Sequence, residues 1–439
     1  MKKILLTTIA LFGMIVLSNA QDNDYYTIVD SVKYKLGNLS GIAIDYYSPR
    51  CAVAYECLAS SGIVSMPDSI TFTECPQSLR GTYPVGRIGN HCFSGKEGIT
   101  SVILPGTVKI LDEDCFSGCS GITSILLPNS IIEIRQYAFS GTGITSITIP
   151  DSVSALAQGC FANCRSLSSV TFPPNFRSIG CRCFVNCTSL VSIDAPSAKV
   201  GDVCGGSGHF DGEWGYPGAF EGCTSLQTVR LGGSVGDDAF YGCTNLTTIE
   251  CNIGSVTGDD YRIGYEAFRK CTNLRFLNIG RTKRIGLGAF SGGCGTNLDT
   301  LKVMQEVPGN IGWDTPSSTG HYYNSPRTGD IDLEHTVLVV PCNSMNDYEN
   351  WQPWSLFWNI VEDCSGNNEG IEYPISTNTI EVYSIDGRIY IKGANAVLFS
   401  IDGRMLGTIQ NNQASQILPQ GVYMVKVGTM SARKVVVIR

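Results

Sequence analysis

The sequence FSGCSGITSILLPNSIIEIRQYA, residues 116–138, contains the pattern that decides the fold. A phenylalanine is followed three residues later by a cysteine and then by an aliphatic run that ends in proline. The alternating aliphatic residues before Pro128 indicate a strand that buries one face. Proline ends such a strand because it cannot donate to the backbone ladder. The next phenylalanine, Phe139, begins a closely similar stretch.

This unit recurs along the chain in nine copies, numbered here by their phenylalanines in order. These are Phe93, Phe116, Phe139, Phe161, Phe184, Phe220, Phe240, Phe268 and Phe290. The copies have a period of about 23 residues. The intervals from Phe184 to Phe220 and from Phe240 to Phe268 are longer and indicate insertions. One such unit is too small to close a core, so the copies must stack and form internal columns of phenylalanine and aliphatic residues.

The repeat resembles the BspA-like leucine-rich repeat family of bacterial surface proteins, over residues 64 to about 303. The fold class expected from the stacking and the resemblance is a mainly β (α+β) leucine-rich repeat solenoid, right-handed and with short helical turns. A small all-β carboxy-terminal domain is expected to follow it.

Residues 1–20 have the pattern of a secretory signal peptide. Lys2 and Lys3 precede an apolar run from Ile4 to Leu17, and small residues precede an expected cleavage before Gln21. The run is short for a bilayer, and no later stretch of about 18 apolar residues occurs. We therefore expect an exported chain without a transmembrane span.

The two ends of the repeat region carry strand-like patterns that suit caps, which a stacked sheet needs at its open edges. Residues 21–88 are the expected amino-terminal cap, with apolar residues at Val64, Ile70, Phe72, Tyr83, Val85 and Ile88. Residues 89–303 are the expected solenoid. Residues 304–364 are expected to hold an insertion and a closing strand and helix.

A linker and a separate tail are expected after the cap. Residues 365–377 are rich in Asn, Gly, Ser and Pro, and residues 378–439 predict a small β domain. Ser384-Ile385-Asp386-Gly387-Arg388 recurs as Ser400-Ile401-Asp402-Gly403-Arg404, each Asp-Gly flanked by strand-forming residues. The tail is similar to the sorting domain of type IX secretion. That similarity implies export machinery as a partner and the cell surface or exterior of a Gram-negative bacterium as the location.

The 19 cysteines would suggest a disulfide framework in an exported protein, but their register indicates packing. Many lie at fixed positions beside the phenylalanines: Cys119, Cys164, Cys187, Cys223, Cys243 and Cys271 three residues after, Cys294 four after, and Cys92, Cys115, Cys160 and Cys183 immediately before. Other copies have alanine before the phenylalanine, so we expect small, buried, reduced side chains. A zinc interpretation lacks a histidine cluster. The better disulfide candidates are Cys51, Cys57, Cys75, Cys342 and Cys364.

Catalytic patterns are weak. Gly232-Gly233-Ser234-Val235-Gly236 matches a nucleophile elbow on paper, but it falls in a repeat turn without the following long helix. Asp330-x-Asp332-x-Glu334 lacks the glycine and distal glutamate of a calcium loop. We expect no enzyme, no cofactor and no metal site. The net charge of −8 argues against nucleic acid as a partner.

Surface recognition remains as the expected function. Outward strand positions carry Ser and Thr in the early copies and larger polar residues in the later ones, where the insertions add aromatic residues. The candidate ligand-binding residues are Trp214, Tyr216, Arg230, Glu250, Arg275, Asn278, Lys302, Trp313, Tyr322 and Tyr323.

The expected partner is an extracellular macromolecule, bound by a monomer. The resemblance implies a matrix protein such as fibronectin or fibrinogen. A glycan bound on the aromatic residues is an alternative, and a structural surface-layer component is another.

Overall fold

The structure is a computed structural model. It describes residues 15–18, 25–38, 50–201, 218–251, 261–313 and 331–364, and in the tail 381–385, 388–392, 396–400, 405–410, 413–416, 418, 421–426 and 433–437. The chain separates into two compact units, Met1–Asp363 and Cys364–Arg439. The predicted linker, residues 365–377, lies outside the described residues.

The amino-terminal part of the first unit is a mixed sheet. β2 (Tyr25–Val29), β3 (Val32–Asn38) and β4 (Arg50–Cys57) are antiparallel, and β7 (Gly81–Ile88) lies parallel to β4. The other elements here are β1 (Ile15–Ser18), β5 (Ser61–Ser65), β6 (Ser69–Phe72), η1 (Gln77–Leu79), β8 (Gly98–Ile103), β9 (Ile110–Leu111) and β10 (Glu133–Ile134). β1 lies inside the expected signal peptide and pairs with β2, which follows that segment. Cleavage of the signal peptide stays a prediction.

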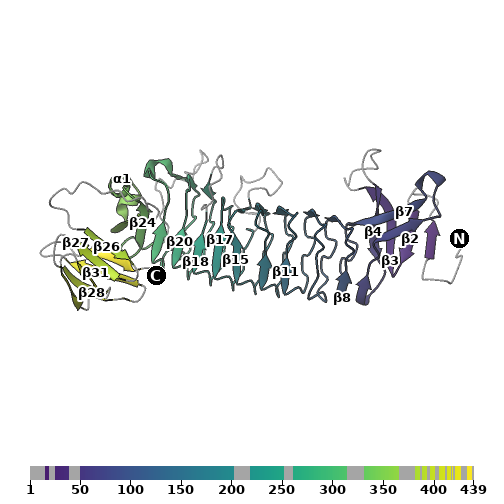
Figure 1. Cartoon of the computed structure of the whole chain (residues 1–439), viewed down its shortest axis with the longest axis horizontal. Coiled ribbons are helices and arrows are strands. Elements are labelled where there is room, and N and C mark those ends of the chain that lie inside the picture. The colour runs from purple at the N-terminus through teal and green to yellow at the C-terminus, as the bar shows by residue number, and fades with distance from the viewer. Residues whose placement is uncertain are drawn as a thin grey trace. The chain divides into compact units, whose positions relative to one another are not determined.

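Each later copy contributes one strand to a principal series, which forms a two-stranded sheet and then a seven-stranded sheet, and most contribute a second, shorter strand. Figure 1 shows these strands side by side along the first unit. The principal strands are β11 (Ser146–Thr148), β13 (Ser169–Thr171), β15 (Ser192–Ala195), β17 (Thr228–Leu231), β18 (Thr248–Glu250), β20 (Phe276–Asn278), β22 (Thr300–Lys302), β24 (Val337–Pro341) and β25 (Asn359–Asp363). The shorter strands are β12 (Ala155–Leu156), β14 (Ser178–Ile179), β16 (Lys199–Val200), β19 (Arg262–Ile263), β21 (Arg284–Ile285) and β23 (Gly312–Trp313). The pairings along both series are parallel.

The period-two pattern predicted for the strands is confirmed by burial. In β17, Val229 and Leu231 are buried while Thr228 and Arg230 are exposed. Copy 2 departs from the expectation, because residues 122–128 form no regular strand although Ile122 and Leu127 are buried. The principal series of strands is therefore also interrupted between β8 and β11.

The nine phenylalanines form one continuous stack inside the solenoid. Consecutive rings lie 5.0 to 6.1 Å apart between centroids, with interplanar angles of 1° to 18°. All nine side chains are buried. The two long intervals do not break the stack, since Phe184 and Phe220 are 5.3 Å apart and Phe240 and Phe268 5.8 Å. The stack is therefore continuous across both intervals.

The segments around the phenylalanines are consecutive turns, which corrects the prediction of short helical turns. The residue two positions after the phenylalanine has a left-handed backbone in all nine copies: Gly95, Gly118, Gly141, Asn163, Asn186, Gly222, Gly242, Lys270 and Gly292. The residue two positions before it is left-handed in most copies. Two left-handed residues so close together prevent a right-handed helix from forming.

The cysteines three residues after the phenylalanines do more than fill space. In six copies the thiol donates a hydrogen bond to the carbonyl of the preceding copy's phenylalanine, at 2.9 to 3.1 Å. Copy 3 has Thr142 at this position, and its hydroxyl lies 3.3 Å from Cys164 Sγ. Copies 2 to 8 therefore all have a side-chain donor at this position, whereas the position before the phenylalanine accepts alanine.

The end of the first unit closes with β24, α1 (Met345–Asn350), η3 (Trp354–Leu356) and β25, after η2 (Pro308–Asn310). Trp354 is buried, with its ring centroid 5.8 Å from that of Tyr348. The strand and helix expected in this region are therefore present.

The second unit contains two antiparallel sheets. One holds β26 (Glu381–Ile385), β27 (Arg388–Lys392) and β30 (Gln413–Ala414), and the other β28 (Ala396–Ser400), β29 (Met405–Ile409), β31 (Gly421–Lys426) and β32 (Arg433–Val437). Buried residues here include Ile389, Leu398 and Val425. Its domain boundary and sorting role stay predictions.

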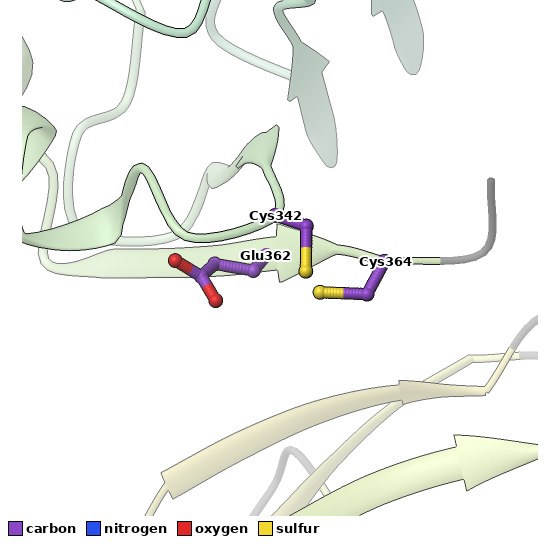
Figure 2. Close-up of side chains that lie close together, drawn as sticks. All are labelled: Cys342, Glu362 and Cys364. Atoms are coloured by element: carbon purple, nitrogen blue, oxygen red, sulfur yellow. The ribbon is translucent and has the colours of Figure 1, made fainter. Parts of the chain in front are cut away.

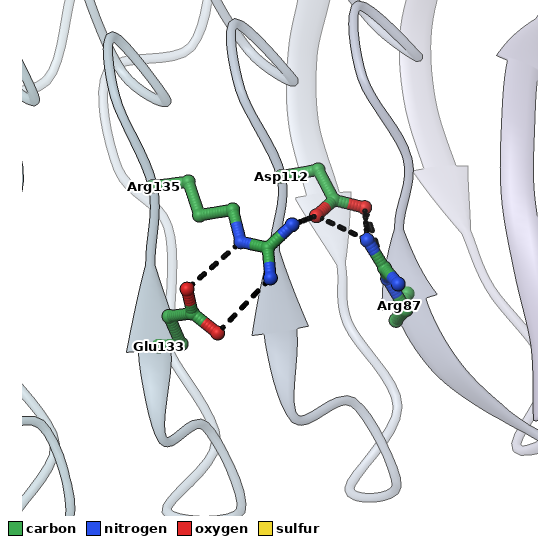
Figure 3. Close-up of polar contacts among 4 residues, drawn as sticks. All are labelled: Arg87, Asp112, Glu133 and Arg135. Carbon is green, nitrogen blue, oxygen red and sulfur yellow. Dashed lines mark hydrogen bonds and ion pairs between the residues drawn. The ribbon is translucent and has the colours of Figure 1, made fainter. Parts of the chain in front are cut away.

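A buried ion network joins the amino-terminal sheet to the first copies (Figure 3). The Asp112 carboxylate, 2% exposed, accepts hydrogen bonds from Arg87 Nη2 at 2.6 Å and from Arg135 Nη1 at 2.9 Å. Arg135 also bonds Glu133, on the exposed side of the network. The three residues Arg87, Asp112 and Arg135 come from three successive rungs, so the network fixes how these rungs are stacked.

We predict that Asp112→Asn lowers the free energy of unfolding by about 3 to 5 kcal/mol, because it leaves a buried guanidinium without its counter-charge. Glu133→Gln, which removes an exposed partner of the same network, should cost less than about 1 kcal/mol. Urea unfolding followed by circular dichroism measures both. Equal effects of the two substitutions would contradict the account.

We also predict that the thiols beside the phenylalanines are reduced and resist alkylation by iodoacetamide until denaturant is added. They are free and buried, and burial raises the pKa of Cys164 to about 11 and of Cys223 to about 12. Mass spectrometry of the native and unfolded chain provides the measurement. Disulfides at most of these cysteines would show that the packing argument is wrong.

Candidate functional site

Four of the predicted binding residues lie in one column on the principal sheet. Arg230 on β17 is in register with Glu250 on β18, Glu250 with Asn278 on β20, and Asn278 with Lys302 on β22. We call these four residues the sheet-face column. Parallel strands in register place equivalent side chains about 4.8 Å apart, so the column is a contiguous feature.

The charges of the column are paired along the sheet. Arg230 Nε lies 3.5 Å from Glu250 Oε2, and Lys302 Nζ lies 2.5 Å from Asp363 Oδ2 on β25. The Arg230 side chain is 55% exposed. An exposed pair such as Arg230–Glu250 contributes little to stability, so a ligand can replace either partner at small cost, whereas the Lys302–Asp363 pair is partly buried.

Asn278 does not contribute to the outward surface, although the sequence predicts that it does. The residue is 6% exposed, and its Oδ1 accepts a hydrogen bond from the Gly280 N–H at 2.9 Å. It caps the turn after β20. The surface part of the column is therefore Arg230, which is exposed, with Glu250 and Lys302, which are half-buried.

Arg275 lies just before β20, and its guanidinium is 3.7 Å from Asp299. It is 55% exposed and also donates to the Asn297 carbonyl at 3.3 Å. The small hydroxyl residues of the early copies have a structural use instead. Ser168 Oγ donates to the Thr145 carbonyl at 3.0 Å. Such bonds between copies explain why hydroxyl residues recur there.

The predicted aromatic contacts cannot be placed in the same way. Trp214, Tyr216, Tyr322 and Tyr323 lie outside the described residues. Trp313 belongs to β23, but its side chain is outside the described part of the structure.

A second group of side chains, which the sequence analysis did not select, gathers on the turns of copies 7 and 8. We call Tyr241, Tyr265, Glu266, Arg269 and Lys270 the turn-edge cluster. Lys270 Nζ lies 2.7 Å from Tyr241 Oη and 4.9 Å from the Tyr241 ring centroid. Arg269 bonds Glu266 at 2.5 Å, and Tyr265 is 46% exposed. Alignment of the copies could have found it, because Lys270 occupies a column otherwise made of glycine and asparagine.

Carboxyl groups beside this cluster share a poorly hydrated environment. Burial raises the pKa of Asp238 to about 7, and the neighbouring Glu266, Glu221 and Asp237 add to the shift, against Arg269. Burial likewise raises the pKa of Glu221. Asp238 and Glu266 occupy equivalent positions in adjacent copies, which places two like charges side by side.

One group of three side chains in the described residues is close enough to share a metal ion: Cys342, Glu362 and Cys364 (Figure 2), with ligand atoms within 4.8 Å of one another. Both cysteines are disulfide-bonded, and the figure shows their sulfur atoms facing each other. A metal needs thiolates, so this group does not suit one in its oxidised form.

The disulfide candidates divide in two. Cys342 and Cys364 are bonded as expected, whereas Cys51, Cys57 and Cys75 are free and buried, which corrects the prediction for those three. Cys181 is also disulfide-bonded and was not among the candidates. Packing inside the amino-terminal sheet explains the free thiols, because burial raises the pKa of Cys51 to about 11.

The weak catalytic patterns have structural explanations. Ser234 is buried, and its Oγ accepts a hydrogen bond from the Arg262 N–H at 3.2 Å. His335 has an acidic partner, since its Nδ1 lies 2.7 Å from Asp332 Oδ2. Asp332 also accepts the backbone N–H groups of Glu334 and His335, so it caps a local turn. In the described residues, no helix is both long and apolar enough to cross a membrane.

We predict that Asp238 makes the solenoid more stable at low pH. A carboxyl whose pKa is raised by folding stabilises fully below its unfolded pKa, and this contribution is lost as the pH rises through about 7. The urea midpoint should therefore fall between pH 5 and pH 8 in the wild-type chain, and fall less in Asp238→Asn. Identical pH profiles for the two chains would contradict the shift.

The comparisons with known proteins agree with the architecture. Residues 86–204 and 216–310 match the BspA type leucine rich repeat region, in six copies. No enzymatic family was found, and the comparison with curated proteins gave no match.

Solved structures similar to the chain include leucine-rich repeat proteins. One from T. pallidum is 23% identical and covers 55% of this chain and 87% of its own, with a TM-score of 0.34. A leucine rich cell surface protein from Faecalibacterium prausnitzii is 18% identical, over 68% of this chain and 97% of its own, with a TM-score of 0.31. The pneumococcal vaccine antigen PcpA is 14% identical and covers 80% of this chain and 100% of its own, with a TM-score of 0.39. The family match thus spans the repeat region, residues 86–204 and 216–310, which is similar to the BspA-type leucine-rich repeat.

Proposed function

We propose that the chain is a non-enzymatic surface or secreted protein that binds an extracellular macromolecule with the sheet face of its carboxy-terminal copies. The observation that carries the proposal is the register of Arg230, Glu250 and Lys302 on three of four successive strands of one seven-stranded sheet, with the buried Asn278 between Glu250 and Lys302. These side chains are held on a rigid backbone and make no contribution to the core, so they are available for contact.

The chemistry of this face favours a protein as ligand. Its charges are of both signs and weakly paired, which suits a partner surface of mixed charge. The resemblance to BspA-like proteins suggests matrix proteins such as fibronectin or fibrinogen. The aromatic residues of the insertions, Trp214, Tyr216, Trp313, Tyr322 and Tyr323, are proposed as additional anchors.

The proposal includes the localisation of the protein. The signal-peptide pattern of residues 1–20 and the sorting-domain resemblance of residues 378–439 support export to the surface of a Gram-negative bacterium. Deleting residues 378–439 in the producing cell and testing surface proteolysis would separate a sorting tail from an ordinary domain. Normal surface display of the truncated chain would overturn the sorting role.

We predict that Arg230→Ser and Arg275→Ser each weaken binding to a confirmed matrix ligand by on the order of 1 to 3 kcal/mol. The melting temperature should stay unchanged, because both side chains are exposed. Thr145→Ala and Thr171→Ala in the early copies provide the matched control and should have little effect. Biolayer interferometry on immobilised fibronectin and fibrinogen gives the affinities.

Three outcomes would contradict the proposal. An equal loss from the threonine variants would place the site at the other end of the solenoid. Binding on a glycan array without binding to matrix proteins would favour the glycan alternative. Concentration-dependent assembly in sedimentation, without any ligand, would favour a structural surface layer.

A further inference from the structure

Lys270 departs from a rule that the other eight copies obey. The position two residues after the phenylalanine has a positive φ in every copy and holds glycine or asparagine everywhere else. Lys270 has φ 64°, a conformation that side chains other than glycine and asparagine rarely adopt. Strain of this kind is common at functional sites.

The position two residues before the phenylalanine is not restricted to glycine and asparagine in this way. Histidine, aspartate, tyrosine, arginine and glutamate all occur there with positive φ: His91, Asp114, Tyr137, Arg182, Asp238 and Glu266. That column tolerates many side chains. The column of Lys270 does not, so the lysine stands out against the rule of its own column.

Neighbouring copies fix the course of the Lys270 side chain. On one side its ammonium contacts the hydroxyl and ring of Tyr241 in copy 7, at 2.7 and 4.9 Å. On the other side a Cβ at Gly292 of copy 9 would lie 3.3 Å from Lys270 Cγ, so glycine there leaves room for the stem. The ammonium is therefore presented at a defined place instead of sweeping through solvent.

The charges of the cluster are unequal. Arg269 is neutralised by Glu266, with Nη1 2.5 Å from Oε2. Lys270 forms no ion pair with a carboxylate among the described residues, and its recorded side-chain partner is the neutral phenol of Tyr241. One cation is thus held without a counter-charge on the Tyr241 phenol, while Tyr265, whose hydroxyl bonds Glu266, is 46% exposed in the same cluster.

We propose that the turn-edge cluster is a second binding site, which takes an anionic sugar residue of an extracellular polysaccharide. One ammonium matches one carboxylate or sulfate, the phenol hydroxyls match sugar hydroxyls, and the exposed Tyr265 ring matches the C–H face of a pyranose. An acidic peptide would satisfy the ammonium alone. The site lies on the turns, apart from the sheet-face column; it rests on the export included in the proposed function and not on binding at the sheet face.

The experiment measures binding of the full chain to three polysaccharides: heparin, which is sulfated, polygalacturonate, which is carboxylated, and neutral dextran. At low salt the chain should bind at least one anionic probe and not dextran, and raised salt should weaken the binding. The preferred probe identifies the source of the anion. No binding to either anionic probe would overturn the proposal.

Four variants test the role of Lys270. Lys270→Gly should weaken binding roughly fivefold, while the melting temperature stays the same or rises because a strained residue is replaced by glycine. Lys270→Arg should keep most of the binding. The double variant Lys270→Gly with Gly242→Lys moves the charge one copy away, where a new Cβ meets nothing within 4 Å, and should not restore binding. Arg230→Ser, on the sheet face, should leave it unchanged.

The contrary results are distinct. Unchanged binding by Lys270→Gly, or a melting temperature that falls together with the affinity, would make Lys270 a structural residue. Poly-glutamate binding as tight as that of the polysaccharides would make the ligand class an acidic peptide. A loss confined to Arg230→Ser would leave the sheet-face proposal intact and overturn this one.

Discussion

The stack of nine phenylalanine rings is the constraint on which the rest of the first unit depends. Offset parallel rings 5.0 to 6.1 Å apart bury large apolar areas and add a favourable interaction of about 0.5 to 1.5 kcal/mol per pair. The thiol-to-carbonyl bonds run between the same copies and hold the phenylalanine backbone in register. The rings on either side of each long interval still stack on one another. Sheet faces and turn edges are therefore fixed in space before any ligand is met.

The repeat, the buried phenylalanines and the packed cysteines could be predicted from the sequence because each follows from spacing alone. A position that recurs in every copy of the repeat and accepts only small or apolar side chains must face the core. The strand pattern could be predicted for the same reason, since burial alternates with period two. Where the interval between Phe184 and Phe220 widens, the flanking copies still match, so the stack was foreseeable there too.

Other features depend on geometry that spacing does not express. The left-handed residues beside each phenylalanine turn the expected helical segments into successive turns, and side chains as varied as Tyr137 and Arg182 occupy them. Asn278 has the strand position of an exposed residue, yet its amide turns inward to cap Gly280. The turn-edge cluster joins residues from two copies across an insertion, so its members are not near neighbours in sequence. The cysteines outside the positions beside the phenylalanines form disulfides according to which strand ends meet, and spacing does not show this.

Both proposed binding surfaces belong to copies that lie beyond the first insertion. They therefore require a core that is continuous across the insertions. Hydrogen–deuterium exchange of the full chain, read by mass spectrometry on peptides that contain each phenylalanine, tests this most directly. The Phe184 N–H bonds the Ala219 carbonyl at 2.7 Å across the first insertion, and the Phe240 N–H bonds Ala267 at 2.9 Å across the second. These peptides should be as protected as those around Phe116 and Phe139. Rapid exchange at Phe184 and Phe240, with protection only within the uninterrupted copies, would show that the stack is broken and contradict the account.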